Sequence, residues 1–114
     1  MEVKNEMVKE IIVTTGNEIP GKQIKQILGI ARGNTVRARN IGRDIGAAFK
    51  NVVGGEIKTY SEMTSQSRDE AYNRMVNNAI EMGADAIIGM RFSTSMVMQG
   101  ASEMLAFGTA VKIK

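Results

Sequence analysis

Alternation of apolar and polar positions dominates the C-terminal third of the chain. From Asp85 to Met98 apolar side chains recur at every second position, and the same period returns from Glu103 to Lys114. A period of two is typical of a half-buried β-strand. The short segment 99–102, which contains a glycine, separates the two runs, so the sequence predicts a long β-hairpin. The expected core-facing positions are Ala86, Ile88, Met90, Phe92, Met96 and Met98 in the first run and Leu105, Phe107, Thr109, Val111 and Ile113 in the second.

A helical period precedes the hairpin. Between Ser61 and Met82 apolar residues fall three and four positions apart, which places them on one face of a long helix. Ser61 is a suitable N-cap for this helix, and Gly83 suits the position just after its last residue. Ser67 and Glu70 have the spacing of a capping box, so the helix could also begin later. A second, shorter apolar stripe predicts a helix over 43–53 that Gly54–Gly55 would end.

The N-terminal half gives weaker signals. The β-branched run from Glu10 to Thr15 predicts a strand, and the alternation from Thr35 to Arg39 an extended segment. The segment from Lys22 to Ile30 is ambiguous and fits a helical turn leading into a strand. The first ten residues form a polar extension, so we expect one domain over residues 11–114.

Together these elements predict the fold class. Strands that bury one face against a helix give a two-layer α+β domain, here an antiparallel sheet packed on one long helix plus a short helix. The hairpin strands run to about a dozen residues, whereas strands usually have about five or six. Their second face is partly apolar at Ile87, Val97 and Ala106. This pattern favours an interface between identical subunits, with Val97 in it, over a monomer with ordinary surface apolar residues.

Composition excludes several kinds of chemistry. The 114 residues include no cysteine and no histidine. Disulfides, thiolate or imidazole metal sites, cysteine nucleophiles and histidine bases are therefore impossible. No P-loop, nucleophile elbow or dinucleotide fingerprint is present. We therefore expect no enzyme, no cofactor and no catalytic residue, and the lack of a signal peptide or an apolar run of spanning length predicts a cytoplasmic protein.

The net charge of +3 is unevenly distributed. Basic residues outnumber acids over 21–50, and the balance reverses over 55–90. The basic segment fits either a small anionic ligand or contact with the acidic segment of a neighbouring subunit. Nucleic acid is a poor fit, because Phe49 is the one aromatic residue in the segment and single-strand binders stack bases on aromatics. The candidate anion-binding residues are Arg32, Arg37, Arg39 and Arg43, whose guanidinium groups match phosphate or carboxylate.

Seven short segments, in order over roughly residues 11–114, make the chain similar to the YbjQ-like family of small bacterial and archaeal proteins. The resemblance implies a dodecin-like β-α-β-β subunit that assembles into a homopentameric ring, with short extra strands joining the subunits. The family is labelled as heavy-metal-binding, so the resemblance also implies this function. The segments are Ile12–Thr15, Leu28–Ile30 with Gly33, Asn40–Asp44, Val53–Gly55 with Tyr60, Ala84–Gly89, Arg91–Ser95 and Gly108–Val111.

Two further expectations concern the matching residues. Asp44 is a candidate for an ion pair between subunits, and the Tyr60 hydroxyl for a bond to a buried backbone group, so both join Val97 as interface candidates. A soft heavy metal prefers thiolate or imidazole ligands, which this chain lacks. Methionine thioethers at Met90, Met96, Met98 and Met104 or carboxylates repeated around a ring are the remaining donors, and methionine is more often a core filler. We expect no metal ligand among these residues.

Overall fold

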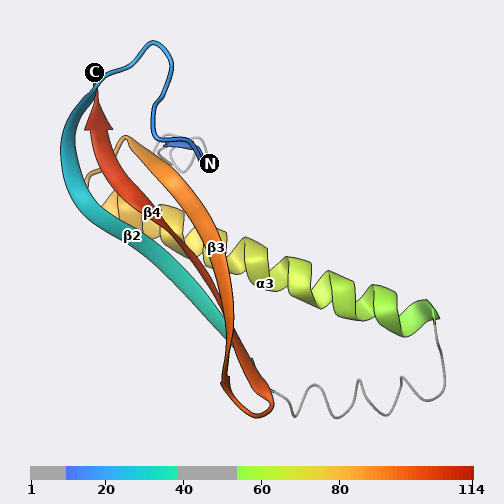
Figure 1. The fold of residues 1–114 in the computed structure, drawn as a ribbon. Helices are drawn as coiled ribbons and strands as arrows, with labels where there is room; N and C mark the ends of the chain where they lie inside the picture. The colour runs from blue at the N-terminus through green and yellow to red at the C-terminus, as the bar shows by residue number, and fades with distance from the viewer. Residues whose placement is uncertain (1–9, 39–53) are drawn as a thin grey trace, which may run out of the picture.

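The structure is a computed structural model that describes residues 10–38 and 54–114. It is an α+β fold in which one long helix packs on a four-stranded mixed sheet (Figure 1). The strands follow the order β1-β3-β4-β2 across the sheet. The elements are β1 (Ile12–Val13), β2 (Ile24–Ala38), α3 (Gly54–Glu81), β3 (Ala86–Met98) and β4 (Ala101–Ile113).

The predicted C-terminal hairpin is confirmed. β3 and β4 pair antiparallel, and the turn between them contains Gly100 at a φ of 87°, a conformation that glycine adopts without steric cost. The ambiguous segment after Pro20 is part of one strand, β2, which pairs with β4 from Ile24 opposite Ile113 to Ala38 opposite Ala101. Pairing along the whole of β4 therefore overrides the local interruptions at the glycines of β2.

The N-terminal strand is shorter than predicted and adds a parallel pair. β1 covers only Ile12 and Val13, which lie opposite Ala86 and Ile87 of β3 in parallel register. The sheet is therefore mixed, where the sequence predicted an antiparallel one. The Thr14 N–H continues the pairing by donating to the carbonyl of Ile87, with an N···O distance of 3.0 Å.

The long helix ends as predicted and begins earlier. Gly83, at a φ of 87°, follows its last turn, and the Ala84 N–H bonds back to the Ala79 carbonyl at 3.0 Å. α3 starts at Gly54 rather than at Ser61 or Ser67, so Gly54 and Gly55 are the first residues of this helix. Glycine is tolerated at a helix N-terminus, where few backbone groups have helical partners. The predicted helix over 43–53 lies outside the described residues.

The face of the hairpin that meets the helix is not the one the sequence predicts. In β4 the buried residues facing α3 are Met104, Ala106 and Ala110, while Leu105 and Phe107 lie on the other face and are only half-buried. The alternation of apolar and polar residues shows that the strand has two faces. The helix packs on the face with small residues, because the helix backbone can approach the sheet closely there. The core under α3 is made of Ala31, Ala71, Met75, Ala79, Ala84, Ile87, Met90, Met104, Ala106 and Ala110.

A β-bulge in β3 also interrupts the row of residues that the sequence predicted to face the core. The register shifts between Ile88 and Arg91, where Gly89 has a φ of 62°. The extra residue exchanges the two faces of the strand. Ile87, opposite Ala110, is therefore a core residue, while Phe92, opposite Ala106, lies on that same face beyond the bulge. The prediction of one continuous face from Ala86 to Met98 is wrong for this reason.

Candidate functional site

The polar positions of β2 form the first part of a candidate site. Along this strand Ala31, Gly33 and Thr35 are buried against α3, while Arg32 and Asn34 alternate with them and are exposed. Cross-strand partners share a face of the sheet. Because Arg32 lies opposite Phe107 and Asn34 opposite Leu105, both polar side chains belong to the face that turns away from the helix.

Gly33 brings the helix onto β2. A Cβ atom built at Gly33 would lie 2.3 Å from the Met75 nitrogen and 2.5 Å from the Ala71 carbonyl oxygen, so only a glycine permits this approach. At this separation two helix side chains reach the outer edge of β2. Asn78 Oδ1 accepts the Arg32 N–H at 3.0 Å, and Arg74 Nη1 donates to the Asn34 carbonyl at 2.6 Å.

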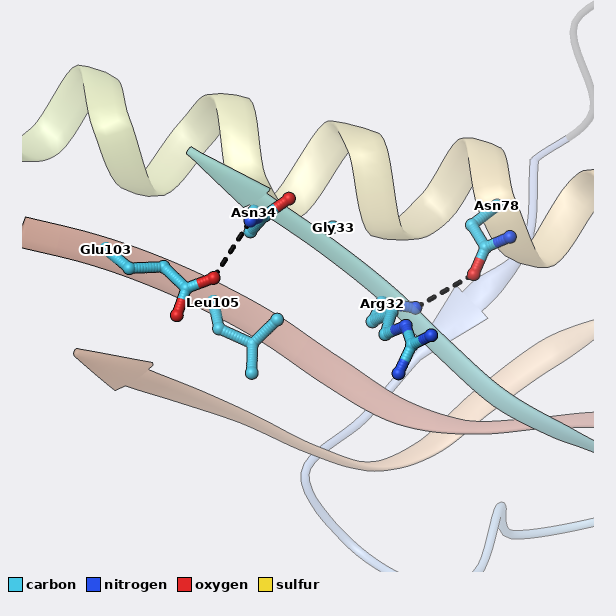
Figure 2. A pocket seen from close by; sticks show the side chains of 6 residues that line it. All are labelled: Arg32, Gly33, Asn34, Asn78, Glu103 and Leu105. Carbon is cyan, nitrogen blue, oxygen red and sulfur yellow. Dashed lines mark hydrogen bonds between the residues drawn. The ribbon is translucent and has the colours of Figure 1, made fainter. Parts of the chain in front are cut away.

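A hollow of about 530 Å³ opens around this strand edge, and we call it the Arg32 hollow (Figure 2). Figure 2 shows Asn78 reaching from α3 to β2, while Asn34 and Glu103 meet across β2 and β4. The Asn34 amide Nδ2 donates to Glu103 Oε2 at 2.8 Å, which occupies that carboxylate. The lining residues are Arg32, Gly33, Asn34, Asn78, Glu103 and Leu105.

Arg32 is the available cation of this hollow. Within residues 10–38 and 54–114 its guanidinium has no hydrogen-bond or ion-pair partner, since the bond to Asn78 uses the backbone N–H. An unpaired guanidinium presents donors in a planar fork that fits a phosphate or carboxylate. The Arg32 guanidinium therefore presents free hydrogen-bond donors to the Arg32 hollow.

A second hollow, of about 320 Å³, lies on the helix side of the sheet. Its basic residue is Arg37, whose Nη2 donates to Glu70 Oε1 at 2.8 Å in an ion pair. Beneath it the buried Thr35 and Ser67 hydroxyls share a hydrogen bond of 3.0 Å. The cation of this hollow is therefore already paired, whereas that of the Arg32 hollow is not paired within the described residues. The remaining lining residues are Thr64, Thr94, Ser102, Glu103 and Met104.

The structure does not bring the described candidate arginines together. Arg32 and Arg37 lie on opposite faces of the sheet, one in each hollow. Arg39, Arg43 and Asp44 lie outside the described residues. Tyr60 falls within α3, in the part where the structure describes the backbone only, and Val97 is exposed near the hairpin tip.

The sequence did not identify Asn34 and Asn78 as site residues, and it indicated Glu103 only as one of the carboxylates that a ring would repeat. Their meeting depends on where α3 lies along β2, and no local pattern carries that information. The four-residue spacing of Arg74 and Asn78, which places both on one helix face, is the single signal that would have suggested a shared role.

The donor set does not fit a heavy metal. Cysteine and histidine are absent from the whole chain, and the described residues contain no cluster of three or more aspartates or glutamates. Of the methionines, Met75, Met90 and Met104 are buried in the core under α3, where they act as packing residues. The soft ligands that a heavy metal prefers are therefore not assembled in the described part of the chain. Among the same residues, no helix has the length and apolar character needed to cross a membrane.

Comparison with known proteins gives consistent matches. Residues 11–114 match the family model YbjQ_1, described as "Putative heavy-metal-binding". A UPF0145 protein of Archaeoglobus fulgidus is 52% identical over 108 residues, covering 95% of this chain and 100% of that protein. A UPF0145 protein of Colwellia psychrerythraea is 54% identical over 104 residues, covering 91% of this chain and 99% of the relative.

A solved structure shares the fold. A DUF74-family protein of unknown function from Pediococcus pentosaceus aligns with a TM-score of 0.61 at 19% sequence identity. The alignment covers 91% of this chain and 98% of that one. At this identity the likeness concerns the fold alone.

Proposed function

This chain belongs to the YbjQ-like family, and from that premise we propose that it acts as a homo-oligomer, a ring of five identical subunits that binds a small anion. The proposed role is binding or structural rather than catalytic, and the proposed location is the cytoplasm. The proposal has two parts. The first and better supported is self-association of the chain, and the second is binding of a small anion at the Arg32 hollow.

The exposed apolar surface of the subunit is the observation that supports self-association. The described chain has a Cα radius of gyration of 17.7 Å, whereas a compact domain of 100 residues has about 13 Å. Large apolar side chains are exposed on both faces of this extended sheet, and a soluble monomer rarely leaves such a surface uncovered. The most exposed are Ile27 (67%), Ile30 (65%), Val36 (52%), Phe92 (44%), Met96 (74%), Val97 (52%) and Met98 (65%).

Native mass spectrometry and sedimentation test the assembly. We expect the wild-type protein to have about five times the subunit mass of 12.4 kDa. Val97→Asp should dissociate it, because a carboxylate buried in an apolar interface loses its hydration without gaining a partner. Gln99→Asp introduces the same charge at the neighbouring exposed turn and should leave the assembly intact. A monomeric wild type would refute self-association, and an intact Val97→Asp assembly would remove Val97 from the interface.

Titration with inorganic phosphate tests the second part. We expect calorimetry to detect binding that Arg32→Gln weakens by about tenfold or more, because a charge-assisted hydrogen bond contributes about 1.5–3 kcal/mol. Arg37→Gln removes the same charge from the opposite face of the sheet and should leave phosphate affinity unchanged. Equal affinity in wild type and Arg32→Gln would show that the Arg32 hollow does not hold the anion.

The heavy-metal label gives an alternative function. It is supported by the family description, but the ligand chemistry of this chain opposes it, as the absence of cysteine and histidine shows. We therefore assign no metal-binding residue.

A further inference from the structure

The Arg32 hollow contains a positive and a negative side chain that do not pair with each other. Arg32 and Glu103 both line the hollow, yet no ion pair joins them within the described residues. Arg32 lies opposite Phe107 and Glu103 opposite Val36, so the two charged residues are four positions apart along the sheet, which corresponds to about 13 Å of strand. The sheet therefore holds opposite charges at two ends of one hollow.

At one end of the hollow the Glu103 carboxylate is oriented but only partly used. Its Oε2 accepts a hydrogen bond from Asn34 Nδ2 at 2.8 Å, which occupies one of the two carboxylate oxygens. Within residues 10–38 and 54–114 no donor reaches the other oxygen, and the side chain is partly buried. A carboxylate in such a position loses hydration without gaining a cation, so this end of the hollow favours a cationic group.

At the other end an amide lies beside the Arg32 guanidinium. Asn78 uses its Oδ1 to accept the Arg32 backbone N–H, so its Nδ2 group carries two further donors. Among the described residues these donors have no acceptor. Guanidinium and amide N–H groups together suit the oxygens of a phosphate or carboxylate. This end of the hollow therefore favours an anionic group.

An apolar side chain separates the two ends. Leu105 lies opposite Asn34, between the level of Arg32 and the level of Glu103, and it is half-buried. Figure 2 shows the Leu105 and Arg32 side chains on the same side of the sheet, with Glu103 beyond Leu105. A hydrocarbon chain can pack on Leu105, because burial of apolar surface there costs no hydrogen bond.

We propose that the ligand of the Arg32 hollow is a small zwitterion, in which a short hydrocarbon link joins a phosphate or carboxylate to an ammonium group. This assignment rests on the proposed anion site and names the class of anion that the site selects. Arg32 and Asn78 bind the anionic end. Leu105 contacts the link, and Glu103 binds the ammonium. An anion without the ammonium lacks the last contact and is repelled by the Glu103 carboxylate.

Calorimetry with two matched ligands tests this preference. Phosphoethanolamine and propyl phosphate carry the same phosphate and have nearly the same shape, but the ammonium of the first is a methyl group in the second. We expect the wild-type protein to bind phosphoethanolamine at least about tenfold more tightly, the factor typical of a charge-assisted hydrogen bond. Equal affinities would overturn the zwitterion site while leaving an anion site in place. Binding of neither ligand would refute the anion site itself.

Glu103→Gln tests which residue recognises the ammonium. Glutamine keeps an oxygen that can accept the Asn34 amide, so the fold should be retained, as circular dichroism would show. We expect the preference for phosphoethanolamine to disappear, with propyl phosphate bound at least as tightly as by the wild type. A preference that survives this substitution would overturn the role of Glu103. If Glu103→Gln does not fold, the comparison of the two ligands on the wild type still decides whether the site selects a zwitterion.

Glu70→Gln is the matched control for the loss of a carboxylate. Glu70 pairs with Arg37 at 2.8 Å on the other face of the sheet, outside the Arg32 hollow. We expect this variant to keep the preference for phosphoethanolamine over propyl phosphate. Loss of the preference in Glu70→Gln as well as in Glu103→Gln would show that overall charge, and not the Glu103 carboxylate, selects the ligand.

The same zwitterion occurs as a free molecule and as the headgroup of a lipid. Sedimentation with vesicles of phosphatidylethanolamine distinguishes these sources, with phosphatidylcholine vesicles as the control because a quaternary ammonium has no N–H to donate. If the wild type binds phosphoethanolamine and does not sediment with the vesicles, the ligand is the free molecule. If it sediments and Glu103→Gln does not, the ligand is the headgroup. In both cases the comparison with propyl phosphate decides whether the site selects a zwitterion.

Discussion

Gly33→Ala should destabilise the protein by about 3 kcal/mol or more, because the added methyl group has no space between β2 and α3. A Cβ at this position would lie 2.3 Å from the Met75 nitrogen, 2.5 Å from the Ala71 carbonyl oxygen and 2.5 Å from Arg74 Cβ. Two of these atoms belong to the helix backbone, so relief requires the whole helix to move away from the sheet. The contacts of Asn78 and Arg74 with the β2 edge would then be lost as well.

Thermal and denaturant unfolding at one fixed subunit concentration would measure this effect, since assembly makes stability depend on concentration. For a chain of this size the expected loss corresponds to a decrease in Tm of roughly 10 °C or more. Gly16→Ala is the matched control, because a Cβ there would lie 3.6 Å from Thr14 Oγ1, an ordinary contact. Stability of Gly33→Ala within about 1 kcal/mol of wild type would contradict the observed approach of helix and sheet.

Met75→Ala should cost about 2–5 kcal/mol, the range measured for large-to-small changes in protein cores. Met75 is fully buried and is among the largest side chains with no exposed surface. It fills the space under α3 between small neighbours that include Ala71 and Ala79, so its removal leaves a cavity that alanines cannot fill.

The control for this prediction is Met75→Leu, which nearly conserves volume and should cost less than about 1.5 kcal/mol. Urea unfolding followed by circular dichroism would compare the three proteins, with the slope of the transition showing whether each variant remains two-state. Equal stabilities of Met75→Ala and wild type would indicate that the helix packs on the sheet through other residues.

The elements that the sequence predicted correctly are those determined by residues close to one another along the chain. The hairpin and the long helix arise from periods of two and of three to four, which are properties of consecutive side chains. Gly83 and Gly100 mark the end of the helix and the turn of the hairpin because each adopts a positive φ that other residues avoid. The α+β class follows from these elements, since each must bury an apolar face against another.

The candidate site was predictable only in part. Arg32 was identified because it is one of the arginines of the basic segment over 21–50, and the structure places it in a hollow. The grouping of Arg32 with Arg37 did not consider on which face of the sheet each would lie. Their odd spacing of five residues along one strand sends them to opposite faces. The amide and carboxylate partners in the hollow come from three separate elements.

Local patterns along the chain were enough to locate the long helix and the hairpin, to exclude thiolate and imidazole chemistry, and to show that the strands carry two partly apolar faces. Three features depend on how the layers pack: which face meets the helix, where the bulge at Gly89 exchanges those faces, and which sheet edge the helix closes. The physical reason is that periodicity is a local property, whereas the choice of face depends on the distance between layers. That distance is set by small residues on separate elements, Gly33 and Ala106 on the strands and Ala71 on the helix.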